Sequence, residues 1–320
     1  MKALVLQALH QPLSFVPDYP EPEQINNHRI VRLNYAAINR RDIWIQKGQY
    51  AHIRVPVILG SDGSGWLDDK PVIINPGFNW GNKESHQGEN FSILGMPLNG
   101  TFAEQVSVPE NNIYPLPNHL SLKEGAALPL AGVTAWRALF TRGRITPKDR
   151  VLITGIGGGV AHLVMKFALA VGAQVSVTSS KDEYLERALK QGCYSVANYK
   201  EKDWAGVLKS KVNSFDLIVD SAGGAAYTSL VKLLDFGGRL VSYGGTTGVI
   251  PALSPQIIFW KQLNLLGSTM GSPKDFEDML DFVRKHEIVP EIGDTFPLSQ
   301  GQTAFEQAEL GGHRKIVLEI

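Results

Sequence analysis

Short runs of apolar and β-branched residues, separated by clusters of Pro, Gly and Asn, fill the chain from residue 1 to about residue 125. Runs of this length that are bounded by turn residues are typical of β-strands. The pattern predicts a compact, mostly β domain with strands over residues 2–6, 28–35, 71–75 and 101–108.

After Leu122 the pattern changes to an alternation of helices and strands. Residues 124–128 and 134–140 have helical character, and further strands are predicted over 151–154, 175–178, 216–219 and 239–243. This alternation implies a parallel sheet with helices on both faces, and hence an α/β fold.

Two later segments complete the pattern. Within residues 273–283, apolar side chains recur at helical spacing, which favours core packing over a functional site; they are Phe276, Met279, Leu280 and Val283. The apolar run 315–320 predicts a terminal strand that returns to the first domain.

The most informative motif lies between the strands predicted at 151–154 and 175–178. A glycine-rich turn, with Gly155, Gly157, Gly158 and Gly159 followed by Val160, leads into an amphipathic helix. In such a unit, bare backbone amides and the helix N-terminus receive the pyrophosphate of a dinucleotide. Ala161 stands at the last position of the motif, where only close helix–strand packing is required. The alternative is a glycine-rich turn in a non-binding α/β unit. A triphosphate-binding loop is excluded because no Gly-Lys-Ser/Thr follows.

Length, charge and cysteine content limit the possible functions. A chain of 320 residues suits two domains. With 31 basic and 31 acidic residues the net charge is zero, which argues against nucleic acid or an anionic membrane as the main partner. Cys193 is the only cysteine and is expected to pack in the core. No signal-peptide pattern and no membrane-spanning apolar run is present, so we expect a cytoplasmic protein with a small-molecule substrate.

Several segments, in this order, resemble the medium-chain dehydrogenase/reductase superfamily, specifically its zinc-independent, quinone-oxidoreductase-like branch. They are residues 37–42, 56–63, 100–104, 128–136, the glycine turn, 219–224 and 237–241. The resemblance implies a GroES-like catalytic β domain over 1–122, completed by 268–320. It also implies a Rossmann domain over 123–267, with a doubly wound parallel sheet, and a homodimer or a higher multiple of dimers.

The zinc-dependent relatives hold their catalytic zinc with Cys, His and Cys, whereas this chain has Asn39, Ser61 and Ala131 at the matching positions. Asp62 alone cannot supply the three ligands that a catalytic zinc site requires. The segment that matches the four-cysteine structural lobe, residues 80–94, contains no cysteine. We therefore expect no metal.

The end of the second Rossmann strand decides between the two nicotinamide cofactors. An NAD site places an acid there to bind the ribose 2′-hydroxyl, but this chain has Ser179. Ser179, Ser180 and Lys181 can instead bind a 2′-phosphate, which favours NADPH over NADH. Asp182 argues in the other direction. Ser180 and Glu183 also match a capping box for the following helix.

Further cofactor contacts are expected along the Rossmann domain. Ser221, Ala222 and Gly223 follow a strand and should line the nicotinamide half, as should Tyr243, Gly244 and Gly245. The resemblance adds Tyr199 beside the adenine and phosphate, and Ser268 and Met270 beside the carboxamide. Arg314 could reach the 2′-phosphate or could be an ordinary solvated cation.

The resemblance places Asn39 near the nicotinamide ribose and the substrate. Trp44 and Tyr50 match pocket-facing aromatic positions, with ordinary core packing as the alternative, and the Tyr50 hydroxyl is a candidate proton donor. His52 is a second candidate donor, although a surface position suits it equally well. Asp42 is expected to fix the local loop geometry.

Without a metal, negative charge on the acceptor must be met by hydrogen-bond donors or delocalised by the substrate. The leading hypothesis is therefore an NADPH-dependent, zinc-independent reductase of quinones or other conjugated carbonyls and alkenes. A non-catalytic NADPH-binding redox sensor or structural protein is the alternative, and a zinc-type alcohol dehydrogenase comes third.

Overall fold

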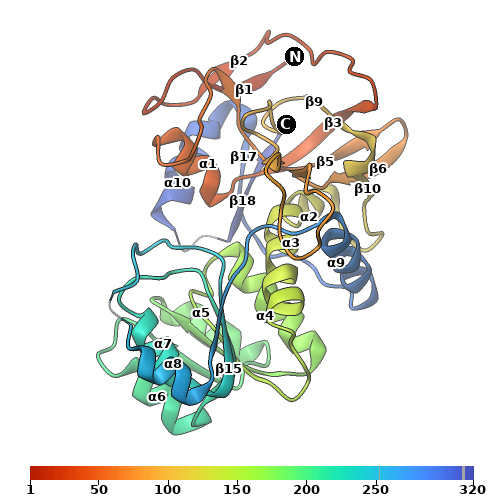
Figure 1. The fold of residues 1–320 in the computed structure, drawn as a ribbon. Helices are drawn as coiled ribbons and strands as arrows, with labels where there is room; N and C mark the ends of the chain where they lie inside the picture. The colour runs from red at the N-terminus through yellow and green to blue at the C-terminus, as the bar shows by residue number, and fades with distance from the viewer. Residues whose placement is uncertain (252, 312–313) are drawn as a thin grey trace. The chain divides into compact units, whose positions relative to one another are not determined.

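The chain leaves its first unit and later returns to it (Figure 1). The computed structural model describes residues 1–251, 253–311 and 314–320. Residues 1–133 and 271–320 form the first unit, and residues 134–270 form the second. These divisions lie after the positions 122/123 and 267/268 expected from the sequence. One reason is that helix α2 (Leu122–Ala126) packs against strands of the first unit, namely β3 (His28–Ala37), β5 (Asp62–Leu67) and β6 (Lys70–Ile74).

A seven-stranded sheet forms the centre of the first unit, with the order β10-β6-β5-β3-β18-β17 and with β9 also paired to β3. The remaining strands of this sheet are β9 (Gln105–Pro109), β10 (Ile113–Pro115), β17 (Ile292–Pro297) and β18 (Lys315–Glu319). β18 runs antiparallel to β3, with Val317 opposite Ala37. The prediction that the C-terminal strand returns to the first domain is thus confirmed.

Smaller elements complete this unit. A three-stranded sheet has the order β2-β1-β4, and β7 pairs with β8. These strands are β1 (Ala3–Leu6), β2 (Ser14–Val16), β4 (Val57–Ile58), β7 (Gly77–Phe78) and β8 (Ser92–Ile93). The helices are α1 (Arg40–Gln46), α9 (Pro273–Lys285) and α10 (Gly301–Leu310), with short 3₁₀ turns at Glu110–Asn112 and Leu298–Gln300.

The core of the first unit follows the apolar pattern. Phe102 and Phe305 meet edge to face among the fully buried side chains of β1 and β4. Helix α9 buries Phe276, Met279, Leu280 and Val283, as its spacing predicts. The strand predicted from residue 101 begins only at Gln105. Residues 101 and 102 instead donate their backbone N–H groups to the carbonyls of Gly60 and Leu59.

The second unit is built on a six-stranded sheet in the order β13-β12-β11-β14-β15-β16, in which all paired strands run parallel. Numbered from its first strand, this order is 3-2-1-4-5-6, the doubly wound arrangement of a Rossmann fold. The strands are β11 (Arg150–Ile153), β12 (Gln174–Ser179), β13 (Ser195–Asn198), β14 (Phe215–Asp220), β15 (Leu234–Ser242) and β16 (Asn264–Gly267).

Helices cover this parallel sheet. α4 (Gly159–Val171) and α5 (Asp182–Lys190) contact β11, β12 and β13. α6 (Trp204–Val212), α7 (Tyr227–Leu233) and α8 (Pro255–Lys261) share an apolar core with β14 and β15. The helix predicted over 134–140 is the end of α3 (Pro129–Trp136), continued by a π-helical segment, Arg137–Arg142. Within the described ranges, no helix is long and apolar enough to cross a membrane.

Candidate active site and nucleotide-binding turn

The end of β3 and the start of α1 form the first part of the candidate site. Asn39 is the N-cap residue of α1, and its backbone N–H donates to Asp42 Oδ2 at 2.8 Å. Asp42 therefore fixes the turn, as expected from the sequence. Its side chain is fully buried, which raises its pKa to about 6 even though Arg41 and Lys315 favour the ionised form.

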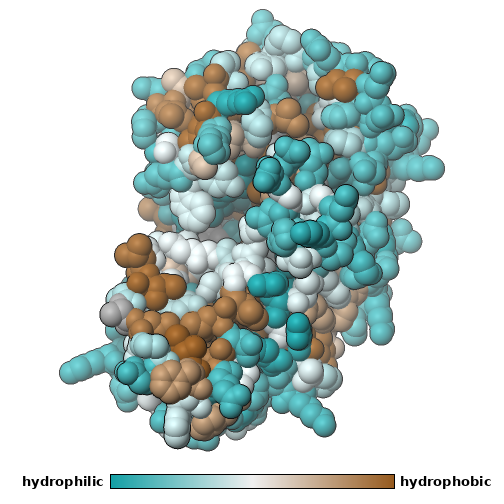
Figure 2. All heavy atoms as spheres, viewed as in Figure 1, coloured by the Kyte–Doolittle hydropathy of each residue, from teal (hydrophilic) through white to brown (hydrophobic). Residues whose placement is uncertain are grey.

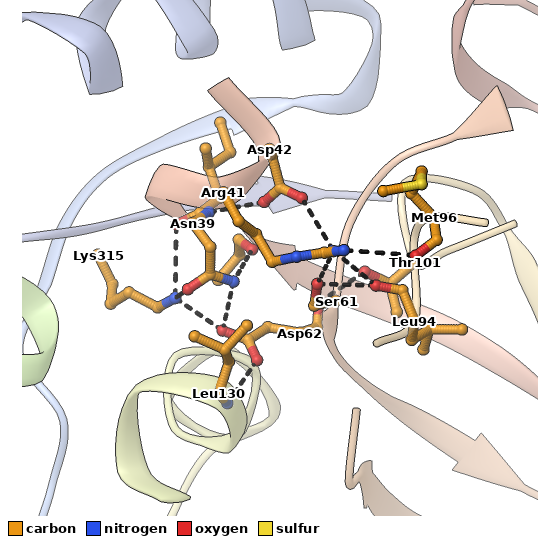
Figure 3. A network of polar contacts seen from close by, with 12 residues as sticks. Asn39, Arg41, Asp42, Ser61, Asp62, Leu94, Met96, Thr101, Leu130 and Lys315 are labelled. Atoms are coloured by element: carbon orange, nitrogen blue, oxygen red, sulfur yellow. Dashed lines mark hydrogen bonds and ion pairs between the residues drawn. The ribbon is translucent and has the colours of Figure 1, made fainter. Parts of the chain in front are cut away.

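A buried polar cluster, defined here as Asn39, Arg41, Asp42, Ser61, Asp62 and Lys315, surrounds this turn (Figure 3). The Lys315 ammonium lies 2.7 Å from Asp62 Oδ2 and 2.6 Å from Asn39 Oδ1. Asn39 Nδ2 in turn donates to Asp62 Oδ2 at 2.9 Å. The three side chains thus form a closed triangle of charge-assisted hydrogen bonds.

The other oxygen of Asp62 leads to a helix. Asp62 Oδ1 accepts the backbone N–H of Leu130 at 2.7 Å, in the first turn of α3. A carboxylate at this position is stabilised by the helix dipole and by an N–H group that the helix leaves unbonded. Asp62 therefore joins the last strand, the start of α1 and the start of α3.

Arg41 connects the polar cluster to a loop and to an aromatic ring. Its guanidinium donates to Ser61 Oγ at 2.7 Å and to the Leu94 carbonyl at 2.9 Å, and Ser61 Oγ donates to the same carbonyl at 2.8 Å. The guanidinium carbon also lies 5.2 Å from the centre of the Tyr50 ring, within cation–π range. Tyr50 is therefore held against the cluster.

The candidate catalytic residues differ in exposure. Asn39 is buried, and its amide hydrogen bonds lead to Asp62, Lys315 and the Ala37 carbonyl, all inside the protein. Trp44 and Tyr50 are half-buried, whereas His52 is exposed. The structure brings Asn39 and Tyr50 to one cluster, and their contact with an acceptor stays a prediction.

In the second unit, the glycine turn connects β11 to α4. Gly155 has a φ of +66°, a left-handed conformation that glycine adopts without strain. The Ile156 N–H donates to the Thr178 carbonyl, which ties the turn to β12. α4 begins at Gly159 with Gly158 as N-cap and no capping side chain. Its first N–H groups thus remain available for an anion, as a dinucleotide pyrophosphate requires.

Asp220, at the end of β14, holds a second turn. Its fully buried carboxylate accepts the Gly223 N–H at 2.8 Å and the Thr154 hydroxyl at 2.6 Å. Thr154 immediately precedes the glycine turn, so one carboxylate joins two of the segments predicted to bind the cofactor. Neither Asp220 nor Thr154 is predicted as a site residue from the sequence, although each is a polar residue at the end of an apolar strand.

The segments predicted to line the nicotinamide half do meet. The Tyr243 N–H donates to the Asp220 carbonyl at 3.0 Å, and the Thr247 N–H donates to the Ala222 carbonyl at 2.9 Å. A side chain at Gly244 would place Cβ 2.7 Å from the Ser221 carbonyl oxygen, so only glycine fits there. Ser221, Ala222 and Gly223 therefore adjoin Tyr243, Gly244 and Gly245.

Beyond this loop, the segment 268–270 follows the edge strand β16. The Ser268 N–H donates to the Ser242 carbonyl at 2.9 Å, so Ser268 continues from the same sheet edge. Met270 is buried, with its sulfur 3.9 Å from the Thr134 hydroxyl.

Burial raises the pKa of the Tyr243 phenol, which therefore stays protonated at neutral pH.

The end of β12 corrects one prediction. α5 begins at Asp182 with Lys181 as N-cap and no capping side chain, so the expected capping box of Ser180 and Glu183 is wrong. The hydroxyl of Ser179, not that of Ser180, accepts a backbone N–H at this turn, that of Lys181 at 3.1 Å. The Tyr199 N–H donates to the Ser179 carbonyl at 3.0 Å, which places Tyr199 beside this turn.

Two further predicted residues have simpler surroundings. Arg314 belongs to the first unit and lies 2.5 Å from a carboxylate oxygen of Glu291, so it is an ion-paired side chain rather than a freely solvated one. Cys193 is buried, which raises the pKa of its thiol to about 12 and confirms packing as its role.

Comparison with known proteins gives the family. Residues 26–118 match the model of the alcohol dehydrogenase GroES-like domain, and residues 159–285 match that of the zinc-binding dehydrogenase. A zinc-type alcohol dehydrogenase-like protein, YogA, of Leptosphaeria maculans is 33% identical over 84% of this chain and 82% of its own. The chain belongs to the medium-chain dehydrogenase/reductase superfamily.

Solved structures of this superfamily have the same fold. A structure described as an NAD-dependent alcohol dehydrogenase has a TM-score of 0.94 at 31% identity, with both chains fully covered. The quinone oxidoreductase of Thermus thermophilus, solved also with NADPH, has a TM-score of 0.85 at 27% identity, again over both full chains. The protein is therefore an oxidoreductase of this superfamily with the fold that binds a nicotinamide dinucleotide.

Part of the superfamily uses zinc, but the residues at the matching zinc-ligand positions, and the polar cluster around them, do not suit it. Asn39 donates its amide hydrogens, Ser61 is bonded to Arg41 and Leu94, and Ala131 has no ligating atom. Two cationic groups, those of Arg41 and Lys315, occupy the cluster. In the part of the chain that the structure describes, no three His, Cys, Asp or Glu side chains are grouped as a metal site requires.

Proposed function

We propose that the protein is an NADPH-dependent reductase of quinones or other conjugated carbonyls and alkenes, and that it works without zinc. The observation that supports this most directly is the polar cluster, in which two anionic and two cationic side chains balance one another. No position in it offers a metal-ligand set, so charge on the acceptor is not met by a Lewis acid.

This charge balance limits the acceptors that can react. Reduction of an isolated ketone produces an alkoxide-like charge that zinc stabilises in metal-dependent enzymes. Quinones and α,β-unsaturated carbonyls spread the charge themselves, because addition of hydride produces a phenolate or an enolate. Such acceptors need only hydrogen-bond donors and a proton.

The residues of this chain then have distinct proposed roles. When bound, NADPH supplies the hydride. The glycine turn and the free N-terminus of α4 hold the pyrophosphate, and the turns at Ser221–Gly223 and Tyr243–Gly245 line the nicotinamide half. Asn39 and Trp44 orient the acceptor, and Tyr50 or solvent provides the proton that completes the reduction.

The proposal is tested by steady-state oxidation of NADPH in the presence of a 1,4-benzoquinone, an enal and an enone, with NADH in parallel. We expect turnover with at least one conjugated acceptor and no loss of activity after treatment with a chelator. As a comparison, oxidation of a primary alcohol with NAD is measured with and without added zinc. Zinc-dependent alcohol oxidation, or binding of NADPH without reduction of any acceptor, would contradict the proposal.

We also propose that the protein is a homodimer assembled through the second unit. Large apolar side chains are exposed on this unit, among them Val249, Phe259 and Trp260, with 91%, 64% and 73% of their surface accessible. Figure 2 shows hydrophobic side chains gathered on its surface near α7 and α8. β16 is the last strand in the order of the sheet, so its outer edge can pair with a second copy.

A further inference from the structure

Two neighbouring residues of opposite charge follow β12, yet they do not pair. Within the described residues, Lys181 and Asp182 form no ion pair with one another. The Lys181 ammonium lies 5.6 Å from the centre of the Tyr184 ring, and Asp182 Oδ1 accepts a hydrogen bond from Asn198 Nδ2 at 2.8 Å. The two charges are thus held by separate partners.

Asn198 is well placed to hold the carboxylate. It is the last residue of β13 and lies opposite Ser179, the last residue of β12, in the parallel ladder. Its Oδ1 accepts the backbone N–H of Lys200 at 3.1 Å. Because the oxygen is bonded to Lys200, the amide nitrogen must face Asp182, and the orientation of the amide is fixed by both contacts.

We infer that Asn198 is a specificity-determining residue for the nucleotide, because it holds the Asp182 carboxylate on the β13 side and keeps the Lys181 ammonium available for a 2′-phosphate. The inference rests on the proposed use of NADPH. In a Rossmann fold the adenosine ribose binds at the carboxyl ends of these strands, and an acid there selects NADH by accepting from the 2′-hydroxyl. Asp182 lies three residues beyond that strand end, and its carboxylate is held on the β13 side by Asn198.

Loss of the hydrogen bond between Asn198 and Asp182 should change the binding of both cofactors. A carboxylate that is free to approach Lys181 neutralises the cation that binds the phosphate, and it repels the phosphate, which carries a charge of about −1.5 to −2. The same carboxylate can accept a hydrogen bond from the 2′-hydroxyl of NADH. Loss of the Asn198 amide therefore weakens NADPH binding and leaves NADH binding unchanged or stronger.

The test measures dissociation constants of NADPH and NADH, and of 2′,5′-ADP and 5′-AMP as fragments, by calorimetry on the full chain. For Asn198→Ala we expect the NADPH preference to fall by about tenfold, equivalent to about 1.4 kcal/mol. Asn198→Asp preserves the size of the side chain but replaces the donor with a second carboxylate, which repels that of Asp182, and should lower the preference at least as far. Glu186→Gln removes an exposed charge from α5, the helix that begins at Asp182, and serves as the control with unchanged preference.

The double variant Asn198→Ala/Asp182→Asn separates this role from a general structural one. If Asn198 acts through the Asp182 charge, the double variant has the same preference as Asp182→Asn alone. The inference is overturned if Asn198→Ala leaves the NADPH preference unchanged, or if its effect persists in the Asp182→Asn background. A wild-type protein that binds NADH more tightly than NADPH contradicts the proposed function instead, whatever the variants do.

Discussion

Replacement of Lys315 by Met tests whether Lys315 and Asp62 form a buried ion pair within the polar cluster. Lys315 and Asp62 have 7% and 0% of their side-chain surface exposed, and their charged atoms lie 2.7 Å apart. At an effective dielectric constant of about 20, the Coulomb attraction at this distance is roughly 6 kcal/mol, most of which offsets the cost of desolvation. Removal of one partner leaves the other charge buried and unpaired, which destabilises a protein by about 3–5 kcal/mol.

The assay is urea-induced unfolding of the full chain, followed by fluorescence and circular dichroism. We expect Lys315→Met to lose about 3–5 kcal/mol, and Lys315→Met/Asp62→Asn to regain much of that loss because no charge is left unpaired. Lys274→Met removes an exposed lysine that pairs with Asp278 and serves as the control with little change. Two results would contradict the reasoning: a Lys315→Met variant that is as stable as Lys274→Met, or a double variant in which Asp62→Asn lowers the stability further. Either would mean that Lys315 and Asp62 do not form a buried ion pair.

Three more predictions follow from the same contacts. Asp42 has a pKa of about 6 in the folded protein against 3.8 in the unfolded chain, so between these pH values it takes up a proton on folding. Relative to Asp42→Asn, the wild type should lose about 2–2.5 kcal/mol of stability as the pH rises from 4 to 7, and a flat difference would refute the assignment. Gly155→Ala and Gly172→Ala both place a side chain in a left-handed conformation and should each lower the free energy of unfolding by about 1–2 kcal/mol. Only Gly155→Ala should also weaken nucleotide binding in a titration, and equal effects on binding would mean that the glycine turn does not hold the nucleotide. Trp260→Glu should convert a dimer to a monomer in sedimentation analysis, whereas a wild-type protein that is already monomeric would disprove the proposed interface.

Much of the architecture could be predicted from local pattern. The alternation of strands and helices predicts the parallel sheet. The glycine turn lies where the motif predicts it, with a positive φ at Gly155 and no capping side chain at the start of the following helix. These features depend on residues that are close in sequence, so that propensity and spacing are sufficient. The missed capping box at Ser180 shows the limit, since the helix begins at Asp182 and the hydroxyl of Ser179, not that of Ser180, accepts a backbone N–H there.

The chemistry of the polar cluster could be predicted only in part. Asn39, Asp42 and Ser61 stand in recognisable motifs, but the partner of Asp62 is Lys315, which lies 253 residues further along the chain. Nothing in the C-terminal apolar run indicates that its lysine faces a carboxylate rather than solvent. The same holds for the hydrogen bond between Asp182 and Asn198, which depends on the register of two adjacent strands. Contacts of this kind become visible only when the sheet order is known.

The position of Lys315 on β18 has a consequence for biosynthesis. The strand that delivers the neutralising ammonium leaves the ribosome after the whole second unit, whereas Asp62 and Asn39 emerge long before it. Until β18 has been made, the first unit lacks the cation that pairs with Asp62 and the strand that pairs with this side of β3. Residues 134–270 are contiguous and can fold before Lys315 has been made, whereas the sheet of the first unit is completed only afterwards.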